Sequence, residues 1–219
     1  MGWDKCEFVE LYNPTDKDVN LTGWTLSDKD THSCSLSASI PSHGFFLVGR
    51  PDYNDNKDDS AWPDADMTSS DFPLMNNNGD EVRLNDSSGN IIDTVGWTTN
   101  AGWYEGLYFT PEPPQGKSIE RKSLSAGYAP CQDTNNNSFD FFVQDTPTPM
   151  NSSSQKMDPA PTPIPVPASI HRNRVARINQ HIERRARSSN VEEKRIISIK
   201  RILESEVFDR QVDHMIFIS

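Results

Sequence analysis

Apolar and polar residues alternate over short stretches of this chain, which is the pattern of β-strands. Residues 7–28 read as a strand, a turn and a second strand. Val9 and Leu11 alternate with Glu10, as in a strand with one buried face. Pro14 then ends the run because proline cannot donate a ladder hydrogen bond, and an apolar run resumes after a polar turn.

The clearest predicted hairpin spans residues 79–97. Val82 and Leu84 alternate with polar residues, residues 86–90 supply a glycine-containing turn, and residues 91–95 return. Further short strands are predicted at residues 33–39, 45–48, 118–121 and 139–143. About seven short strands with frequent turn signals, and no convincing helical periodicity before residue 150, predict an all-β sandwich.

Composition divides the chain into three parts. Residues 1–150 hold the predicted strands and include a long acidic stretch at 50–73. Residues 151–169 are rich in Ser and then Pro, as in a linker. Residues 170–217 contain neither Pro nor Gly. Apolar residues at helical spacing predict that residues 170–219 form a mixed-charge helical tail that can self-associate.

Charge is distributed unevenly between these parts. The chain has 32 acidic and 21 basic side chains; residues 1–158 carry a formal charge of −15 and residues 159–219 one of +4. The acidic part should repel nucleic acid, whereas the arginines of the tail could contact it. No apolar run reaches the roughly 18 residues of a membrane span.

Three cysteines allow two interpretations. Cys6, Cys34 and Cys131 have no zinc-ligand spacing. Either Cys34 and Cys131 form a disulfide in an exported protein, or all three are buried thiols.

Two stretches carry oxygen side chains at alternating positions, as calcium loops do. The first consists of Asp52, Asn54, Asn56 and Asp58, and Lys57 replaces the glycine that an EF-hand loop would need. The alternative for this stretch is a solvated acidic loop. Calcium is therefore a possible cofactor, and no other cofactor is expected.

The second oxygen-rich stretch consists of Asp133, Asn135 and Asn137, just before the last predicted strand. These side chains are calcium-ligand candidates, but Asx side chains also hydrogen-bond their own backbone and fix turns. Both interpretations remain open from the sequence.

Trp103 and Tyr104 are candidates for ligand binding. They lie in a loop rich in Gly and Pro, where exposed aromatic rings can stack on sugars or anchor an interface. Loop aromatics can also cap the end of a sandwich, and Trp97, which closes the hairpin, is expected in the core.

The predicted domain lacks a recognisable catalytic constellation. His32 and His43 are its only histidines, no serine lies in a GxSxG context, and no pair of carboxylates stands out for acid–base chemistry. We therefore expect no enzymatic activity.

The segments EFVELYNP, LTGWTLSD, FFLVG, GDEVRLND, NIIDTVGW, GKSIER and DTNNNSFDFFVQDTPTPMNSS occur in this order. Their order and spacing over residues 7–150 resemble the lamin-tail domain family, in the form found in prokaryotic surface and secreted proteins. Members of that family normally have another strand upstream. We expect either that the sequence starts inside the domain or that the sandwich lacks an edge strand.

The resemblance implies an immunoglobulin-like β-sandwich that serves as a non-catalytic module outside the cell or at its surface. Its partner would be a protein or a cell-envelope polysaccharide, bound by loops at one end of the sandwich. Two alternatives are a calcium-dependent carbohydrate-binding accessory domain and an accessory domain of an extracellular nuclease-like enzyme.

Overall fold

The computed structural model describes residues 6–30, 32–73, 75–76, 78–161 and 217–218. Twelve strands and two four-residue helices lie in these ranges: β1 (Phe8–Tyr12), β2 (Val19–Asn20), β3 (Thr25–Ser27), β4 (Ser33–Ser35), β5 (Ser39–Ile40), β6 (Phe45–Gly49), α1 (Tyr53–Asn56), β7 (Met67–Thr68), β8 (Asp80–Asn85), β9 (Ile91–Trp97), β10 (Ser118–Arg121), α2 (Asn137–Asp140), β11 (Phe141–Gln144) and β12 (Phe217–Ile218). None of the helices in this described part is long and apolar enough to cross a membrane.

One sheet has four strands in the order β4-β3-β8-β9. Strands β8 and β9 form the predicted hairpin, with Asp80 opposite Trp97 at its open end and Asn85 opposite Ile91 next to the turn. Gly89 adopts a φ of +81° in that turn, a conformation that glycine accepts without steric strain. The hairpin prediction is confirmed.

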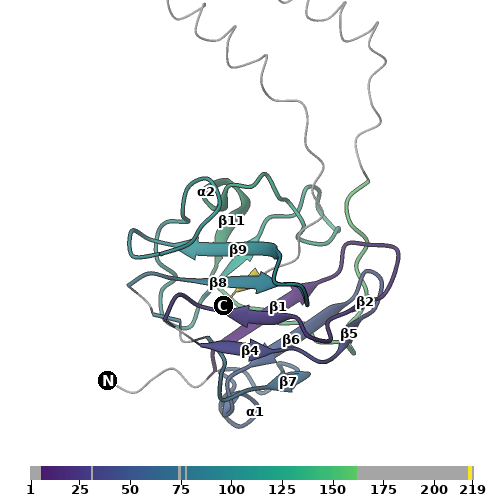
Figure 1. Ribbon diagram of the computed structural model, residues 1–219. Coiled ribbons are helices and arrows are strands. Elements are labelled where there is room, and N and C mark those ends of the chain that lie inside the picture. Colours follow the sequence, from purple (N-terminus) through teal and green to yellow (C-terminus); the bar gives the residue numbers. More distant parts are fainter. Residues whose placement is uncertain (1–5, 31, 74, 77, 162–216, 219) are drawn as a thin grey trace, which may run out of the picture. The chain divides into compact units, whose positions relative to one another are not determined.

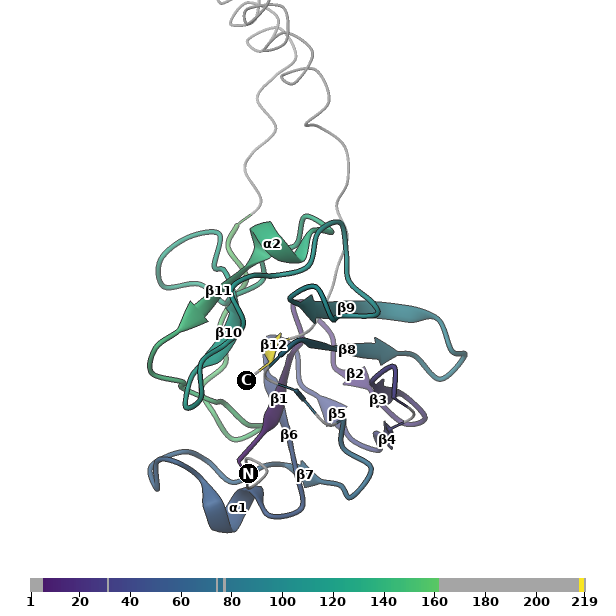
Figure 2. The ribbon, with the colours of Figure 1, turned by 90° about the vertical axis from the view of Figure 1, so that its left-hand side faces the viewer.

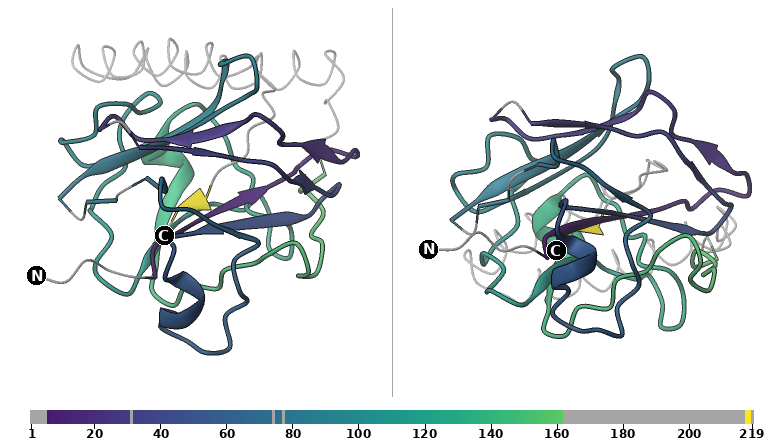
Figure 3. Two further views of the ribbon diagram at one scale, coloured as in Figure 1. Left: turned by 60° about the horizontal axis from the view of Figure 1, so that its bottom comes forward. Right: turned by 90° about the horizontal axis from the view of Figure 1, so that it is seen from below.

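The second large sheet has the order β11-β10-β12-β1-β6-β7 (Figure 1). Strand β1 pairs along its whole length with β6, and β7 runs parallel to β6. On its other side β1 pairs with β12, which in turn pairs with β10. Figure 3 shows β12, in yellow, beside the purple strand β1. Strands β2 and β5 form a separate two-stranded sheet.

The main hydrophobic core is built from apolar residues of both large sheets, which form two layers (Figure 2). The four-stranded sheet contributes Val82, Leu84 and Val95, and the six-stranded sheet contributes Val9 and Ile119. Trp97 is 2% exposed and belongs to this core, as predicted. The fold is an all-β, immunoglobulin-like sandwich.

Strand β1 differs from the prediction of one buried face. All five of its residues are buried. On the face away from the main core, Phe8 packs edge-on against Tyr53 of α1 and against Trp62, while Tyr12 packs on Phe45. The acidic stretch and the segment near residue 157 thus cover a face that the alternation with Glu10 assigned to solvent.

The acidic stretch is a folded cover that includes α1 and β7. Tyr53 is fully buried, and its hydroxyl donates a hydrogen bond to the Pro63 carbonyl at 3.4 Å. The Asp66 carboxylate accepts hydrogen bonds from the Leu47 and Ser152 backbone nitrogens. Elsewhere, the single strand predicted at residues 33–39 is divided into β4 and β5.

The packed domain extends beyond residue 150. Asn151 donates a side-chain hydrogen bond to the Asp64 carbonyl, and the Tyr12 hydroxyl donates one to the Met157 carbonyl. The His43 ring lies 2.8 Å from the Asp158 carboxylate. Residues 151–158 are therefore part of the domain rather than of a linker, because these polar groups bind the sandwich.

The helical tail predicted for residues 170–219 lies outside the described residues except at Phe217–Ile218. Those two residues form a strand, so the helix prediction is wrong at that point.

The two cysteines of the disulfide alternative lie in different hydrophobic clusters. Cys34 is buried in the core between the sheets, and Cys131 packs against the cluster of Tyr12 and Phe45. Both are free thiols, and burial raises the pKa of each. The structure thus agrees with the thiol interpretation for this pair.

Candidate functional site

The loop that contains the candidate aromatic residues leaves β9 and is closed at its base. Thr98 donates a backbone hydrogen bond to the Phe109 carbonyl, and Phe109 donates one to the Gly96 carbonyl, both at 2.8 Å. Trp97 and Phe109 are buried at this base. The loop from 98 to 109 therefore begins and ends on the core, and its middle is held away from it.

Asn137 of α2 holds the middle of this loop against β9 through hydrogen bonds. Its side-chain oxygen accepts hydrogen bonds from the backbone nitrogens of Gly96 at 2.9 Å and Glu105 at 3.2 Å. Its amide nitrogen donates to the Thr94 carbonyl at 2.9 Å. Asn137 is fully buried, so one side chain satisfies three backbone groups of β9 and the loop.

The first half of the loop lies against β8 and β9. The buried Glu81 carboxylate accepts a hydrogen bond from the backbone nitrogen of Gly102. A Cβ at Gly96 would lie 2.2 Å from the Trp103 carbonyl oxygen, so only glycine permits this close approach. These contacts order the loop without covering its outer side.

A buried arginine supports the same end of the sandwich. The guanidinium of Arg121 on β10 is fully buried and lies 2.7 Å from the Asp93 carboxylate of β9. It also lies 3.5 Å from Asp133 and 4.0 Å from Asp140. Removing one member of such a group leaves an unpaired buried charge, so the cluster fixes the relative positions of β9, β10 and the turn before α2.

Glu105, in the loop, faces this cluster. Burial, and then the negative charges of Asp93 and Asp133, raise the pKa of Glu105 to about 8, although Arg121 opposes them. Glu105 is therefore mostly protonated at neutral pH. The cluster then contains three carboxylates around one arginine rather than four.

Large apolar side chains are exposed on the loop and on α2, two segments that hydrogen-bond to each other. Tyr104, Leu107 and Phe139 are 45%, 57% and 61% exposed. The ring of Tyr104 packs edge-on against that of Tyr108, with 5.6 Å between the ring centres. The backbone nitrogen of Ser138 donates a hydrogen bond to the Leu107 carbonyl, which holds α2 beside the loop (Figure 1). We call this set of four side chains, Tyr104, Leu107, Tyr108 and Phe139, the aromatic loop surface.

The two predicted ligand-binding aromatics differ in their availability. Tyr104 belongs to the aromatic loop surface. Trp103 is half-buried, and the guanidinium of Arg83 lies 3.8 Å from its ring centre, so one face of the indole is occupied by a cation–π contact. The sequence analysis did not select Leu107 and Phe139 as ligand-binding residues. The signal that could have indicated them is an apolar residue within an otherwise polar, glycine-containing segment.

The four calcium candidates of the first stretch lie in and around α1. The Asn54 side-chain oxygen accepts a hydrogen bond from the Ala65 nitrogen, and the Asn56 amide donates to the Asp52 carbonyl. Asp58 borders a small hollow at the start of β1. The two amides thus serve the local backbone.

The second stretch is built around the arginine cluster. Asp133 pairs with Arg121 and accepts a hydrogen bond from the Asn135 nitrogen, which matches the predicted Asx turn. Asn137 bridges β9 and the loop. Within the described ranges no group of three His, Cys, Asp or Glu residues is arranged to hold a metal ion. Calcium binding at either stretch stays a prediction.

Comparison with known proteins agrees with the architecture. No curated protein matches the chain. Residues 2–99 match the family model described as Lamin Tail Domain, and this region includes strands β1 to β9. That family consists of structural, immunoglobulin-like domains, in agreement with the sandwich described above. Residues 2–99, which include strands β1 to β9, are therefore assigned to the lamin tail domain family.

Proposed function

We propose that this sandwich is a non-catalytic interaction module that binds a protein partner through the aromatic loop surface. The observation that carries the proposal is the exposure of Tyr104, Leu107 and Phe139 on backbone that Asn137 and the Arg121 cluster hold in place. Exposed apolar side chains on an ordered support lose little conformational entropy on binding, which is a property of interface anchors.

Charge and side-chain type indicate the chemistry of the partner. Residues 1–158 carry a formal charge of −15, so a partner with basic residues around an apolar patch would be attracted. Leu107 and Phe139 have no hydrogen-bonding groups in their side chains, which suits an apolar protein surface better than a sugar. The proposal keeps the extracellular or cell-envelope location implied by the resemblance to surface and secreted proteins.

Site-specific photo-crosslinking tests this function. A photoreactive amino acid at position 107 is compared with one at position 91, because Ile91 is equally exposed (55%) but lies on the hairpin. With a cell-envelope fraction of the source organism, position 107 should give discrete protein adducts that Phe139→Ser abolishes. Identical adducts from both positions would contradict the proposal.

The carbohydrate alternative rests on Tyr104, whose exposed ring is braced by Tyr108. A sugar-stacking role predicts binding on a glycan array that is lost in Tyr104→Ala and kept in Leu107→Ser. Calcium dependence of that binding would be tested with EDTA. Glycan binding with this pattern would replace the protein partner by a polysaccharide.

A further inference from the structure

Strands β1 and β10 lie on either side of β12 and do not pair with each other. Both are antiparallel to β12, so they run parallel to one another with a space of one strand between them. We call this space the strand slot. It lies inside the six-stranded sheet, not at its edge (Figures 1 and 3).

The strand slot requires an occupant. Val9 and Ile119 on its two sides are almost completely buried, and Glu10 is 6% exposed. Backbone N–H and C=O groups that are buried without partners cost free energy, and β1 and β10 direct such groups toward the slot. An inserted strand satisfies both sides at once.

Pairing in the slot is described at two residues of the C-terminal segment, since residues 162–216 and 219 lie outside the described ranges. β12 contributes Phe217, opposite Glu10, and Ile218, opposite both Val9 and Ile119. By contrast, β1 has five residues and β10 has four. The slot can therefore pair with an extended segment along four to five residues, the lengths of β10 and β1.

The register defines what the slot accepts. Val9 and Ile119 are core residues, and directly opposite positions of paired strands share a face, so position 218 falls on the core side. Position 217 faces Glu10, whose pKa is raised by burial to about 8. The slot thus favours an extended segment with apolar residues and no acidic residue, as in the run Met-Ile-Phe-Ile at 215–218.

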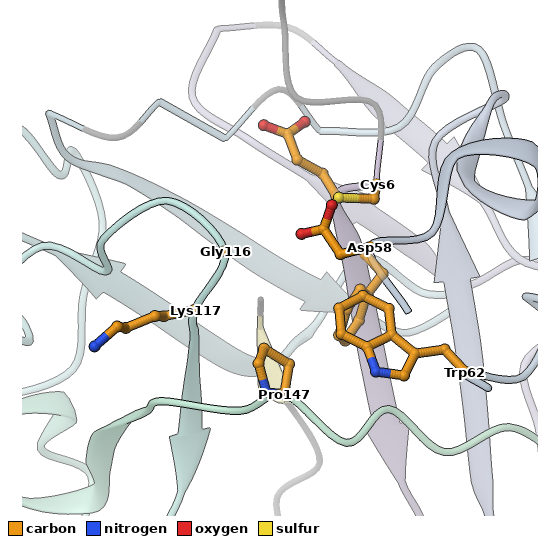
Figure 4. Close-up of a pocket in the computed structure, with 8 residues that line it drawn as sticks. Cys6, Asp58, Trp62, Gly116, Lys117 and Pro147 are labelled. Carbon is orange, nitrogen blue, oxygen red and sulfur yellow. The ribbon is translucent and has the colours of Figure 1, made fainter. Parts of the chain in front are cut away.

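A small hollow continues the slot beyond the end of β12. It is lined by Cys6 and Phe8 at the start of β1, by Lys117 at the start of β10, and by Trp62 and Pro147 (Figure 4). Because β12 is antiparallel to β1, the C-terminal end of β12 lies toward the start of β1, where this hollow is. The amine of Lys117 pairs with Asp145 and points away from Trp62, and the acidic residues Glu7 and Asp58 also line the hollow.

We propose that the strand slot is a binding site for an extended peptide, and that the C-terminal segment of this chain, centred on Phe217–Ile218, is its replaceable occupant. Binding adds a strand between β1 and β10, with main-chain hydrogen bonds for affinity and the position opposite Val9 for specificity. This proposal is independent of the aromatic loop surface, since it uses none of its residues.

The test uses the full chain with Ile218→Asp, and Ile199→Asp as a control with the same chemical change elsewhere in the tail. The probe is a fluorescent peptide with the sequence of residues 210–219. In the wild type the tethered segment competes at an effective concentration on the order of millimolar. Ile218→Asp should therefore bind the peptide about tenfold or more tightly than the wild type and the control do.

The same variants are compared by thermal unfolding. Ile218→Asp should melt at least about 4 °C below the wild type. Saturating peptide should raise the melting temperature of the variant back to the wild-type value. A peptide carrying the Ile218→Asp change should neither bind the variant nor raise its melting temperature. Unchanged melting of the variant, together with no peptide binding to any of the three proteins, would overturn the proposal.

Two further measurements cover the remaining outcomes. If Ile218→Asp does not fold even with peptide, amide hydrogen exchange of the wild type decides: slow exchange along β1 and β10 supports an occupied slot, and fast exchange there refutes it. The molecular mass of the wild type in solution shows whether the strand comes from the same chain or from a second copy. A monomer is expected, and a dimer that exchanges this strand between copies would contradict occupation by the same chain.

Discussion

The two sheets of the sandwich are assembled in different ways. In the four-stranded sheet, β3 pairs with β4 and β8 with β9, and each of these pairs is a hairpin of neighbouring segments. In the six-stranded sheet, β1 pairs with β6 and with β12 at the opposite end of the chain. Each hairpin of the first sheet can form from local contacts, and within that sheet the pairing of β3 with β8 joins distant segments. The central strand β1 of the second sheet instead pairs on both sides with segments that are distant in the sequence.

The difference also concerns polar groups. The six-stranded sheet buries Glu10 and Arg121 within its strands. Arg121 is compensated by Asp93 of the other sheet, and Glu10 is compensated by protonation and by one hydrogen bond from the Met150 nitrogen. The long-range sheet therefore depends on contacts from outside itself, and the predictions below probe that dependence.

The largest expected effect comes from Arg121→Met. The substitution leaves Asp93, Asp133 and Asp140 buried without their cation, which should lower the free energy of unfolding by about 3–5 kcal/mol at pH 7. Urea unfolding measures the change. Lys117→Met removes a partly exposed pair with Asp145 and should cost less than about 1 kcal/mol. Equal losses in the two variants would contradict a structural role for the cluster.

A smaller effect is expected in the local sheet. Leu84→Ala opens a cavity between the sheets and should lower the free energy of unfolding by about 2–4 kcal/mol. Ile91→Ala, on the exposed start of β9, should change it by less than about 0.5 kcal/mol. Chemical unfolding followed by tryptophan fluorescence compares them. A similar loss at Ile91 would show that the hairpin residue is less exposed than described.

The smallest effect is the pH dependence that Glu10 contributes. Burial raises its pKa from 4.5 to about 8, with a smaller contribution from Glu120, so folding favours the protonated carboxyl. Its contribution is complete below pH 4.5 and is lost as pH rises toward 8. Relative to the wild type, Glu10→Gln should gain about 1–3 kcal/mol between pH 5 and pH 8. Glu112→Gln, at an exposed position, should follow the wild-type profile.

The sequence predicts the local sheet well because its signals lie close together. The alternation of Val82 and Leu84 and the turn at Gly89 are sufficient for β8 and β9. The same alternation around Glu10 indicates a strand correctly but assigns one face to solvent, since nothing in residues 7–12 records the distant segments that cover it. Covering segments are a tertiary property that a local pattern does not contain.

The candidate site is predictable only in part. Tyr104 could be chosen by residue type and loop context. The buried position of Arg121, which supports this loop, could have been inferred from the sequence. Arg121 follows Ile119 by two residues in a strand and so lies on the same, core-facing side. The acidic partners come from β9 and the turn before α2, and no local spacing connects them. Short helices such as α1, with four residues, are below the length at which periodicity is informative.

The most direct test of the contrast between the sheets is residue-resolved amide hydrogen exchange of the full chain with Ile218→Ala. This milder substitution should weaken the hold of β12 without adding a charge. We predict faster exchange at Val9, Glu10 and Ile119, which border the strand slot, with unchanged exchange in β8 and β9. Equal acceleration in both sheets, or none in either, would contradict a long-range sheet that depends on the C-terminal strand.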